Sequence, residues 1–140
     1  MTMTQISARL SIAVHILTLI ATSAQACTGD YIAGSVNTNP AIIRRMMGML
    51  KRAGLIDVRA GVGGSSLKRS AADITLLDVY RAVNAAEEKR LFRIHDAPNP
   101  QCPVGRNIED VLQAELSEAQ SAMEQRLAQT TISQLTAKFR

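Results

Sequence analysis

Apolar residues recur every three or four positions in several stretches of this chain, which is the spacing of one helix face. Four of these stretches predict helices near residues 5–24, 29–36, 40–53 and 72–85. Asn39 followed by Pro40 is typical of a helix start, because the amide oxygen caps free N–H groups and proline has none to satisfy. Gly54 is expected to end the third helix. The N-terminal half is therefore predicted to be a small helical domain.

The spacing changes after Gly54. Residues 55–59 predict a short strand and residues 65–69 a returning strand, with a loop rich in glycine between them. Two short helices that meet at a tight turn, followed by such a hairpin, form the plan of a winged helix-turn-helix. The expected fold class is mainly α, with a winged helix-turn-helix, a two-stranded β wing and a long C-terminal dimerisation helix.

The dimerisation helix is expected over about residues 103–129, where apolar positions form one stripe: Val104, Ile108, Leu112, Leu116, Ala119, Met123 and Leu127. A single small domain covers only part of so long a face, so the stripe predicts pairing with the same helix of a second copy. The alternative is a helix folded back on its own domain. A last short helix, residues 132–139, is expected to pack either on the partner or on the DNA-binding half.

These elements predict three parts. Residues 1–85 form the winged helix-turn-helix domain, residues 86–102 a loop, and residues 103–140 the dimerisation helix with the short C-terminal helix.

Composition and charge narrow the range of functions that the chain could have. Hydrophobic residues make up 46% of the 140 residues but aromatic ones only 3%, a palette that suits packed helices better than a β-sandwich. The net charge is +4, divided as +6 over residues 1–71 and −2 over residues 72–140. Basic charge thus gathers on the half predicted to hold the helix-turn-helix, where a polyanion would bind. A merely soluble basic surface is the alternative.

Candidate DNA contacts lie in this basic half. Arg44 and Arg45 are one turn into the predicted recognition helix, and arginine binds guanine or phosphate in bidentate fashion. A solvated helix face is the alternative. The other candidates lie at the helix entrance, along its flank or in the hairpin: Thr38, Asn39, Pro40, Lys51, Arg59, Gly61, Gly63, Gly64, Lys68 and Arg69.

The apolar stretch before Cys27 superficially resembles a secretion signal. His15 interrupts this apolar run, and its apolar residues fall at helical spacing, which favours a core helix instead. No apolar run reaches the roughly 18 residues that a membrane span needs. A cytoplasmic protein with no membrane partner is expected.

The two cysteines, Cys27 and Cys102, provide neither a disulfide framework nor a zinc-ligand set. Cys102 directly precedes the predicted long helix, whose dipole would lower the thiol pKa and make this residue a candidate redox sensor. The alternative is a small side chain with no such role. Cys27 is a weaker candidate, and a disulfide between the two is an open possibility. No arrangement of residues indicates an enzyme.

Several segments, in this order, carry a resemblance to a known family: residues 38–45 (TNPAIIRR), 50–56 (LKRAGLI), the glycines after Arg59, and 73–80 (DITLLDVY). Together they resemble the Rrf2 family of bacterial transcription regulators. The resemblance implies a winged-helix dimer that is joined by its long C-terminal helix and binds a roughly palindromic operator. Residues 99–105 (NPQCPVG) resemble the branch of the family without an iron–sulfur cluster.

The cysteine count agrees with that branch. Cluster-binding members of the family place three cysteines close together in the loop before the dimerisation helix, whereas here that loop holds only Cys102. We therefore expect no iron–sulfur cluster, no metal site and no other cofactor, and an effector that the sequence does not identify. The predicted function is a transcription regulator, expected to be a repressor, that binds double-stranded DNA as a homodimer. The alternative is a helical dimer that binds proteins and not DNA.

Overall fold

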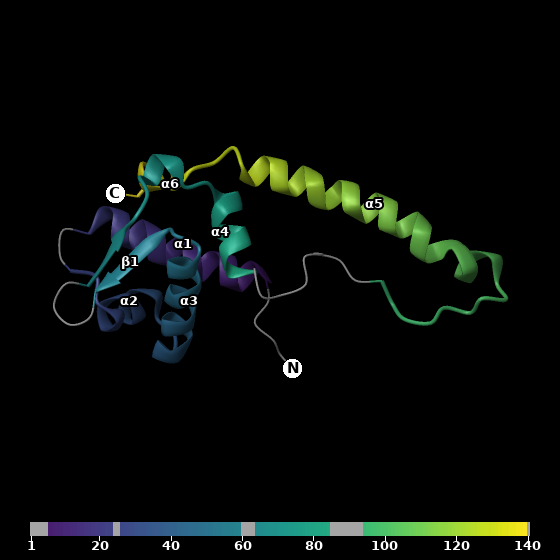
Figure 1. The fold of residues 1–140 in the computed structure, drawn as a ribbon, viewed down its shortest axis with the longest axis horizontal. Helices are drawn as coiled ribbons and strands as arrows, with labels where there is room; N and C mark the ends of the chain where they lie inside the picture. The colour runs from purple at the N-terminus through teal and green to yellow at the C-terminus, as the bar shows by residue number, and fades with distance from the viewer. Residues whose placement is uncertain (1–5, 24–25, 60–63, 85–93, 140) are drawn as a thin grey trace.

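A computed structural model describes residues 6–23, 26–59, 64–84 and 94–139 of the chain (Figure 1). In chain order its elements are α1 (Ile6–Thr22), α2 (Gly29–Val36), α3 (Pro40–Arg52), β1 (Ile56–Arg59), β2 (Gly64–Leu67), the 3₁₀ turn η2 (Ala71–Asp73), α4 (Leu76–Val83), α5 (Pro103–Leu127) and α6 (Ile132–Thr136). β1 and β2 form a two-stranded antiparallel sheet in which Ile56 faces Leu67 and Arg59 faces Gly64. The expected winged helix-turn-helix fold with a long C-terminal helix is confirmed.

Local chemistry sets the ends of the helix-turn-helix. The Asn39 side chain accepts a hydrogen bond from the backbone N–H of Ala41 at 2.7 Å and so caps α3. At the other end of α3 the backbone passes through Gly54, whose φ is 80°, and the N–H of Leu55 returns to the carbonyl of Leu50 at 3.0 Å. Glycine adopts this left-handed conformation without a steric penalty, so it ends the helix and turns the chain into β1.

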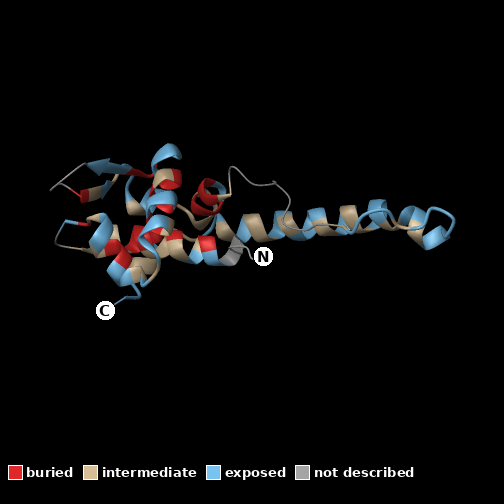
Figure 2. Ribbon diagram, turned by 90° about the horizontal axis from the view of Figure 1, so that it is seen from below, coloured by how far each residue is buried: buried red, intermediate tan, exposed pale blue. Residues whose placement is uncertain are grey.

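The core lies where α1, α2, α3 and α4 meet the base of the wing (Figure 2). It is built almost entirely from aliphatic side chains and methionine, as the composition indicates. Fully buried members from successive elements are Ile16, Leu17, Ile32, Ile43, Leu50, Leu55, Ile56, Ile74, Val79, Val83 and Ile132. Each such side chain stabilises the fold by roughly 1.5–3 kcal/mol relative to an exposed one.

The largest difference from the predicted boundaries is at the start of α4, while α6 ends at Thr136 and β2 at Leu67, a few residues before their predicted ends. The expected helix over residues 72–85 begins only at Leu76, after a separate turn, η2. Thr75 and Asp78 form a reciprocal capping box, and Ile74 before them is extended. The cause is long-range: Ile74 and Leu76 form backbone hydrogen bonds with Ile132 and Thr130 near the C-terminus. A helical continuation through Ile74 would lose that pairing.

The C-terminal helices take two different courses. α5 extends away from the globular part as an arm, and none of its residues is buried (Figures 1 and 2). α6 returns and packs on α1 and η2 of its own chain, which settles the alternative left open for the last helix. The predicted division at residue 85 falls outside the described residues. Within the described part of the chain, no helix is both long and apolar enough to cross a bilayer.

Candidate nucleic-acid interface

The outer face of α3 is set by what its inner face buries. Ile43, Met46 and Leu50 lie in the core, so the helix turns Arg44, Arg45 and Lys51 outward. Arg44 and Lys51 are about two turns apart and therefore share one side of the helix. Gly48, between them on that side, adds no side chain to the surface.

This side of α3 forms one wall of a groove of about 360 Å³, and the wing forms the opposite wall. The groove brings together four of the predicted DNA contacts, Arg44, Lys51, Arg59 and Gly64. Its other lining residues were not predicted as contacts: Cys27, Thr28, Gly29, Met47, Gly48, Val58 and Ser65. No sequence pattern links residues 27–29 to the hairpin, because their contact with it arises only in the folded chain.

The charges in the groove are basic. Arg44, Lys51 and Arg59 are exposed, and among the described residues none of them forms an ion pair. The nearest acid along β1 is Asp57, two residues from Arg59 and also exposed. Three cations from two elements therefore face one concave surface, an arrangement that binds phosphate groups.

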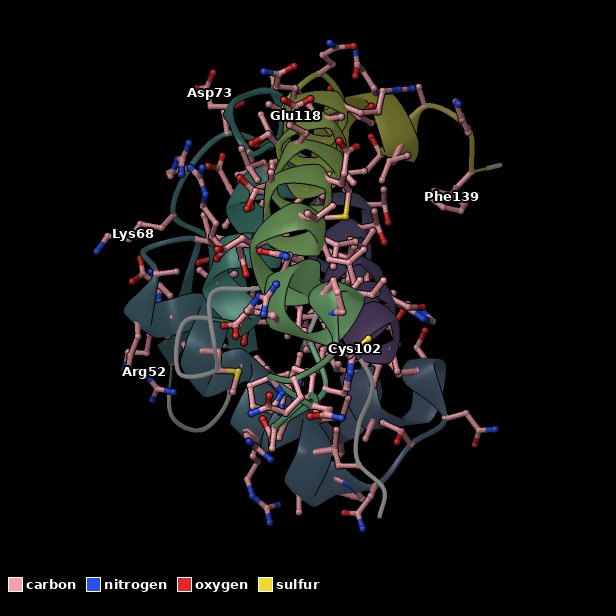
Figure 3. The ribbon with its side chains drawn as sticks, turned by 90° about the vertical axis from the view of Figure 1, so that its right-hand side faces the viewer. Arg52, Lys68, Asp73, Cys102, Glu118 and Phe139 are labelled. Carbon is pink, nitrogen blue, oxygen red and sulfur yellow. The ribbon has the colours of Figure 1, made fainter. Side chains whose placement is uncertain are left out.

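The other predicted contacts that the structure describes do not line this groove. Thr38, Asn39 and Pro40 are at the entrance of α3, and Arg45 is exposed on the helix beside Arg44. Lys68 projects from the same edge of the molecule as Arg52, beyond the end of β2 (Figure 3). Gly61 and Gly63 fall outside the described residues.

Arg69 is already engaged within the fold. Its guanidinium donates to the backbone carbonyl of Asp73 and lies 3.4 Å from the Asp78 carboxylate. Asp78 in turn caps α4, so Arg69 holds the junction between β2 and α4. The Arg69 side chain nevertheless remains 42% exposed, and its predicted phosphate contact stays a prediction.

The two cysteines lie in different surroundings. Cys102 is exposed at the N-terminus of α5, at the end of the arm that faces the viewer in Figure 3. The backbone N–H groups of Gly105 and Val104 lower the pKa of its thiol, because they favour the thiolate. Cys27 is buried beside the wing. Within the described part of the chain neither cysteine forms a disulfide, and α2, which follows Cys27, lies at the opposite end of the molecule from the start of α5 (Figure 1).

The predicted dimer stripe lies along the arm, and none of its residues is buried. Val104 keeps 68% of its surface exposed, and Ile108, Leu112, Leu116, Met123 and Leu127 are only half-buried, while Ala119 is exposed. Val111, which the stripe did not include, is 59% exposed. The arm contacts its own domain through α4, where Arg81 lies 3.9 Å from Glu124.

The family model for Rrf2, described as an iron-dependent transcriptional regulator, matches residues 6–138. The chain belongs to the Rrf2 family. A relative from Bacillus subtilis (strain 168), which is named as an HTH-type transcriptional regulator, YwnA, is 48% identical over 127 residues, covering 91% of this chain and 93% of the relative. Both relatives matched in this comparison are named as regulators and neither as an enzyme.

Solved structures agree with this assignment. A crystal structure described as a DNA binding protein is 42% identical, with a TM-score of 0.73, and the match covers 91% of this chain and 97% of the other. A transcriptional regulator from Lactobacillus plantarum is 27% identical with a TM-score of 0.74, covering 92% and 87% of the two chains. Staphylococcus aureus CymR, at 22% identity and a TM-score of 0.65 over 91% and 94%, shares the fold.

The description of the family as iron-dependent raises the question of which residues would hold iron. A two-iron cluster needs four ligands, mostly cysteine thiolates. This chain has two cysteines in all, one buried beside the wing and one exposed on the arm. Among the described residues, no three side chains of His, Cys, Asp or Glu gather where they could hold a metal ion. The donor set does not fit a cluster.

Proposed function

We propose that this Rrf2 protein is a homodimeric repressor that binds a roughly palindromic site in double-stranded DNA. The observation that carries the proposal is the groove in which Arg44 and Lys51 of α3 lie opposite Arg59 of β1. A groove with cations on both walls suits a phosphate backbone that runs between a recognition helix and a wing. The protein would act in the cytoplasm, where DNA is available to it.

The geometry of α3 supports a role in reading bases. A helix fits the major groove, and its N-terminal residues reach the base edges. Arg44 and Arg45 lie in the second turn of α3, exposed and beside the capped N-terminus. In this arrangement Thr38 and Asn39 lie near phosphate, Arg45 faces bases, and the groove behind Arg44 holds the sugar-phosphate chain.

Dimerisation through α5 would supply the twofold symmetry of such a site. The stripe from Val104 to Leu127, of which no residue is buried, is the surface on which we propose that two copies pair. Two recognition helices held in this way would contact half-sites about 10 base pairs apart, or a multiple of that spacing.

The thiol of Cys102 is the proposed place for a signal to act. It is exposed and its pKa is lowered, so it reacts with a hydroperoxide more readily than an ordinary thiol. The thiolate takes one peroxide oxygen to become a sulfenic acid, and the other oxygen leaves as hydroxide or alkoxide and takes up a proton. Because Cys102 adjoins the proposed dimer stripe, this change would act through the pairing of α5. Cys27 is buried and is the weaker candidate.

Fluorescence anisotropy tests the proposal directly. The purified protein is titrated against a duplex from the region upstream of its own gene and against a scrambled duplex, over a series of salt concentrations. We expect tight binding to the first duplex, and a loss of about tenfold or more for Arg44→Ala/Arg45→Ala, since each base contact contributes about 1–3 kcal/mol. Lys138→Ala, which removes an exposed cation near the C-terminus, is the matched control.

The opposite result has a defined meaning. Equal, weak and strongly salt-dependent binding to both duplexes would show only general attraction between a basic surface and DNA. The protein would then be a helical dimer that binds other proteins.

A further inference from the structure

The start of β2, at the loop end of the hairpin, lies against the chain between α1 and α2. The backbone N–H of Ser65 donates a hydrogen bond of 3.0 Å to the carbonyl of Cys27, and the two residues form an isolated antiparallel bridge. Cys27 therefore lies along the outer edge of β2, while β1 pairs with the inner edge. The start of β2 is therefore held along both of its edges.

Gly64 makes this approach possible. Its φ is 68°, and a Cβ atom added to it would lie 2.9 Å from the backbone nitrogen of Cys27 and 3.1 Å from the carbonyl carbon and oxygen. These atoms belong to the main chain, so they cannot move aside as the end of a flexible side chain does. Any side chain at position 64 must push β2 away from Cys27.

The same contact fixes the position of a cation. Arg59 is the residue directly opposite Gly64 in the β1–β2 ladder, so a displacement of β2 at Gly64 is passed to Arg59. Cys27 is followed at once by Thr28, whose side chain caps α2. A single stretch of backbone thus holds both the wing and the first helix of the helix-turn-helix.

We propose that Gly64 is a positioning residue for DNA binding: by letting β2 rest on the backbone of Cys27, it sets the distance between Arg59 and the recognition helix α3. The sequence alone treats Gly64 as one of three equivalent loop glycines that approach DNA. The structure gives it a different role, because its bare backbone faces Cys27. This inference rests on the proposed function, since it concerns how the groove is held open for a phosphate.

Three substitutions separate the effect of the contact between position 64 and Cys27 from the effect of backbone strain. Gly64→Ala adds the Cβ atom and strains the left-handed backbone. Gly64→Asn adds the same atom, but asparagine tolerates a positive φ far better. Gly54→Ala is the matched control, because Gly54 also has a positive φ, 80°, and nothing lies within 4 Å of its added Cβ.

Affinity and its salt dependence are the readouts, measured with the upstream duplex. We expect both Gly64 variants to bind about tenfold more weakly and to make the negative slope of log K against log salt shallower by about 1, as for the loss of one phosphate contact. Gly54→Ala should keep the slope of the wild-type protein. Gly64→Ala combined with Arg59→Ala should bind no more weakly than Arg59→Ala alone, because both changes remove the same contact.

A further variant covers the case in which the Gly64 variants do not fold. Ser65→Pro removes the N–H that donates to the carbonyl of Cys27 and adds no atom at Gly64. It should make the slope of log K against log salt shallower in the same way. Variants that keep the wild-type slope, or losses that multiply in the double variant, would overturn the inference. A wild-type protein that does not distinguish the two duplexes would instead overturn the proposed function, so the two failures are distinct.

Discussion

The backbone N–H of Ile132 donates a hydrogen bond of 2.8 Å to the carbonyl of Ile74, which joins the chain beyond α5 to the segment before α4. Next to it the N–H of Leu76 donates to the carbonyl of Thr130 at 2.9 Å, and Thr75 and Thr131 form a bridge. The C-terminal end of α5 is thereby fixed to the winged-helix domain. Only the other end of the arm, near Cys102, extends away from the domain (Figure 1).

The first prediction concerns this junction. Ile132 is fully buried, so Ile132→Ala should lower the free energy of unfolding by about 2–5 kcal/mol through lost apolar burial and a residual cavity. Urea unfolding followed by circular dichroism measures the change. Lys138→Ala, on an exposed residue close by, should change it by less than about 0.5 kcal/mol. If the two variants were equally stable, the C-terminal segment would not be part of the domain.

The second prediction concerns the stripe on α5. Leu112→Glu should leave the helical content unchanged, because no residue of α5 is buried in the single chain, but it should give a monomer by placing a charge in the proposed interface. Light scattering after size-exclusion chromatography measures the mass. Ser121→Glu places the same charge on the opposite face of the helix and should remain a dimer. A dimeric Leu112→Glu variant would mean that another surface joins the two copies.

The order of the elements could be predicted from the sequence because it depends on local signals. The cap at Asn39 and the turn at Gly54 each lie within a few residues of the structure that they determine. The buried face of α3 followed from spacing in the same way. Met49, also buried, did not, because it is covered by packing from other elements.

What could not be predicted depends on contacts between distant parts of the chain. The extended backbone at Ile74 requires Ile132, and the role of Gly64 requires Cys27. The sequence likewise identified the cations of the DNA-binding half, but only the fold separates Arg59, which lines the groove, from Arg69, which Asp78 holds. A sequence shows which residues are charged, but only the fold shows which charged residues form ion pairs.

The third prediction uses this separation of cations. Lys51→Gln removes a charge from the groove and should weaken binding to specific and scrambled duplexes alike. The negative slope of log K against log salt should become shallower by about 1. Lys138→Gln removes the same charge elsewhere and should leave the slope unchanged. A titration over several salt concentrations distinguishes them, and equal slopes for both variants would place Lys51 away from the DNA backbone.

The fourth prediction concerns iron. Because the donor set does not fit a cluster, the purified protein should carry less than one iron atom per dimer and show no visible absorption from a cluster. Dialysis against a strong chelator should leave the affinity for the upstream duplex unchanged. Loss of DNA binding on chelation, restored by ferrous iron, would require ligands that include residues outside the described part of the chain.

The fifth prediction concerns the reactivity of Cys102. The thiolate is the reacting form, and the N–H groups of Gly105 and Val104 lower the pKa of this thiol in the folded protein. The rate of alkylation by iodoacetamide should therefore rise with pH and level off at a lower pH in the folded protein than in the protein unfolded by urea. Cys102→Ser should abolish the fast reaction, while Cys27, which is buried, should react only on unfolding. If the two profiles coincided, α5 would not activate the thiol, and peroxide should then leave DNA binding unchanged.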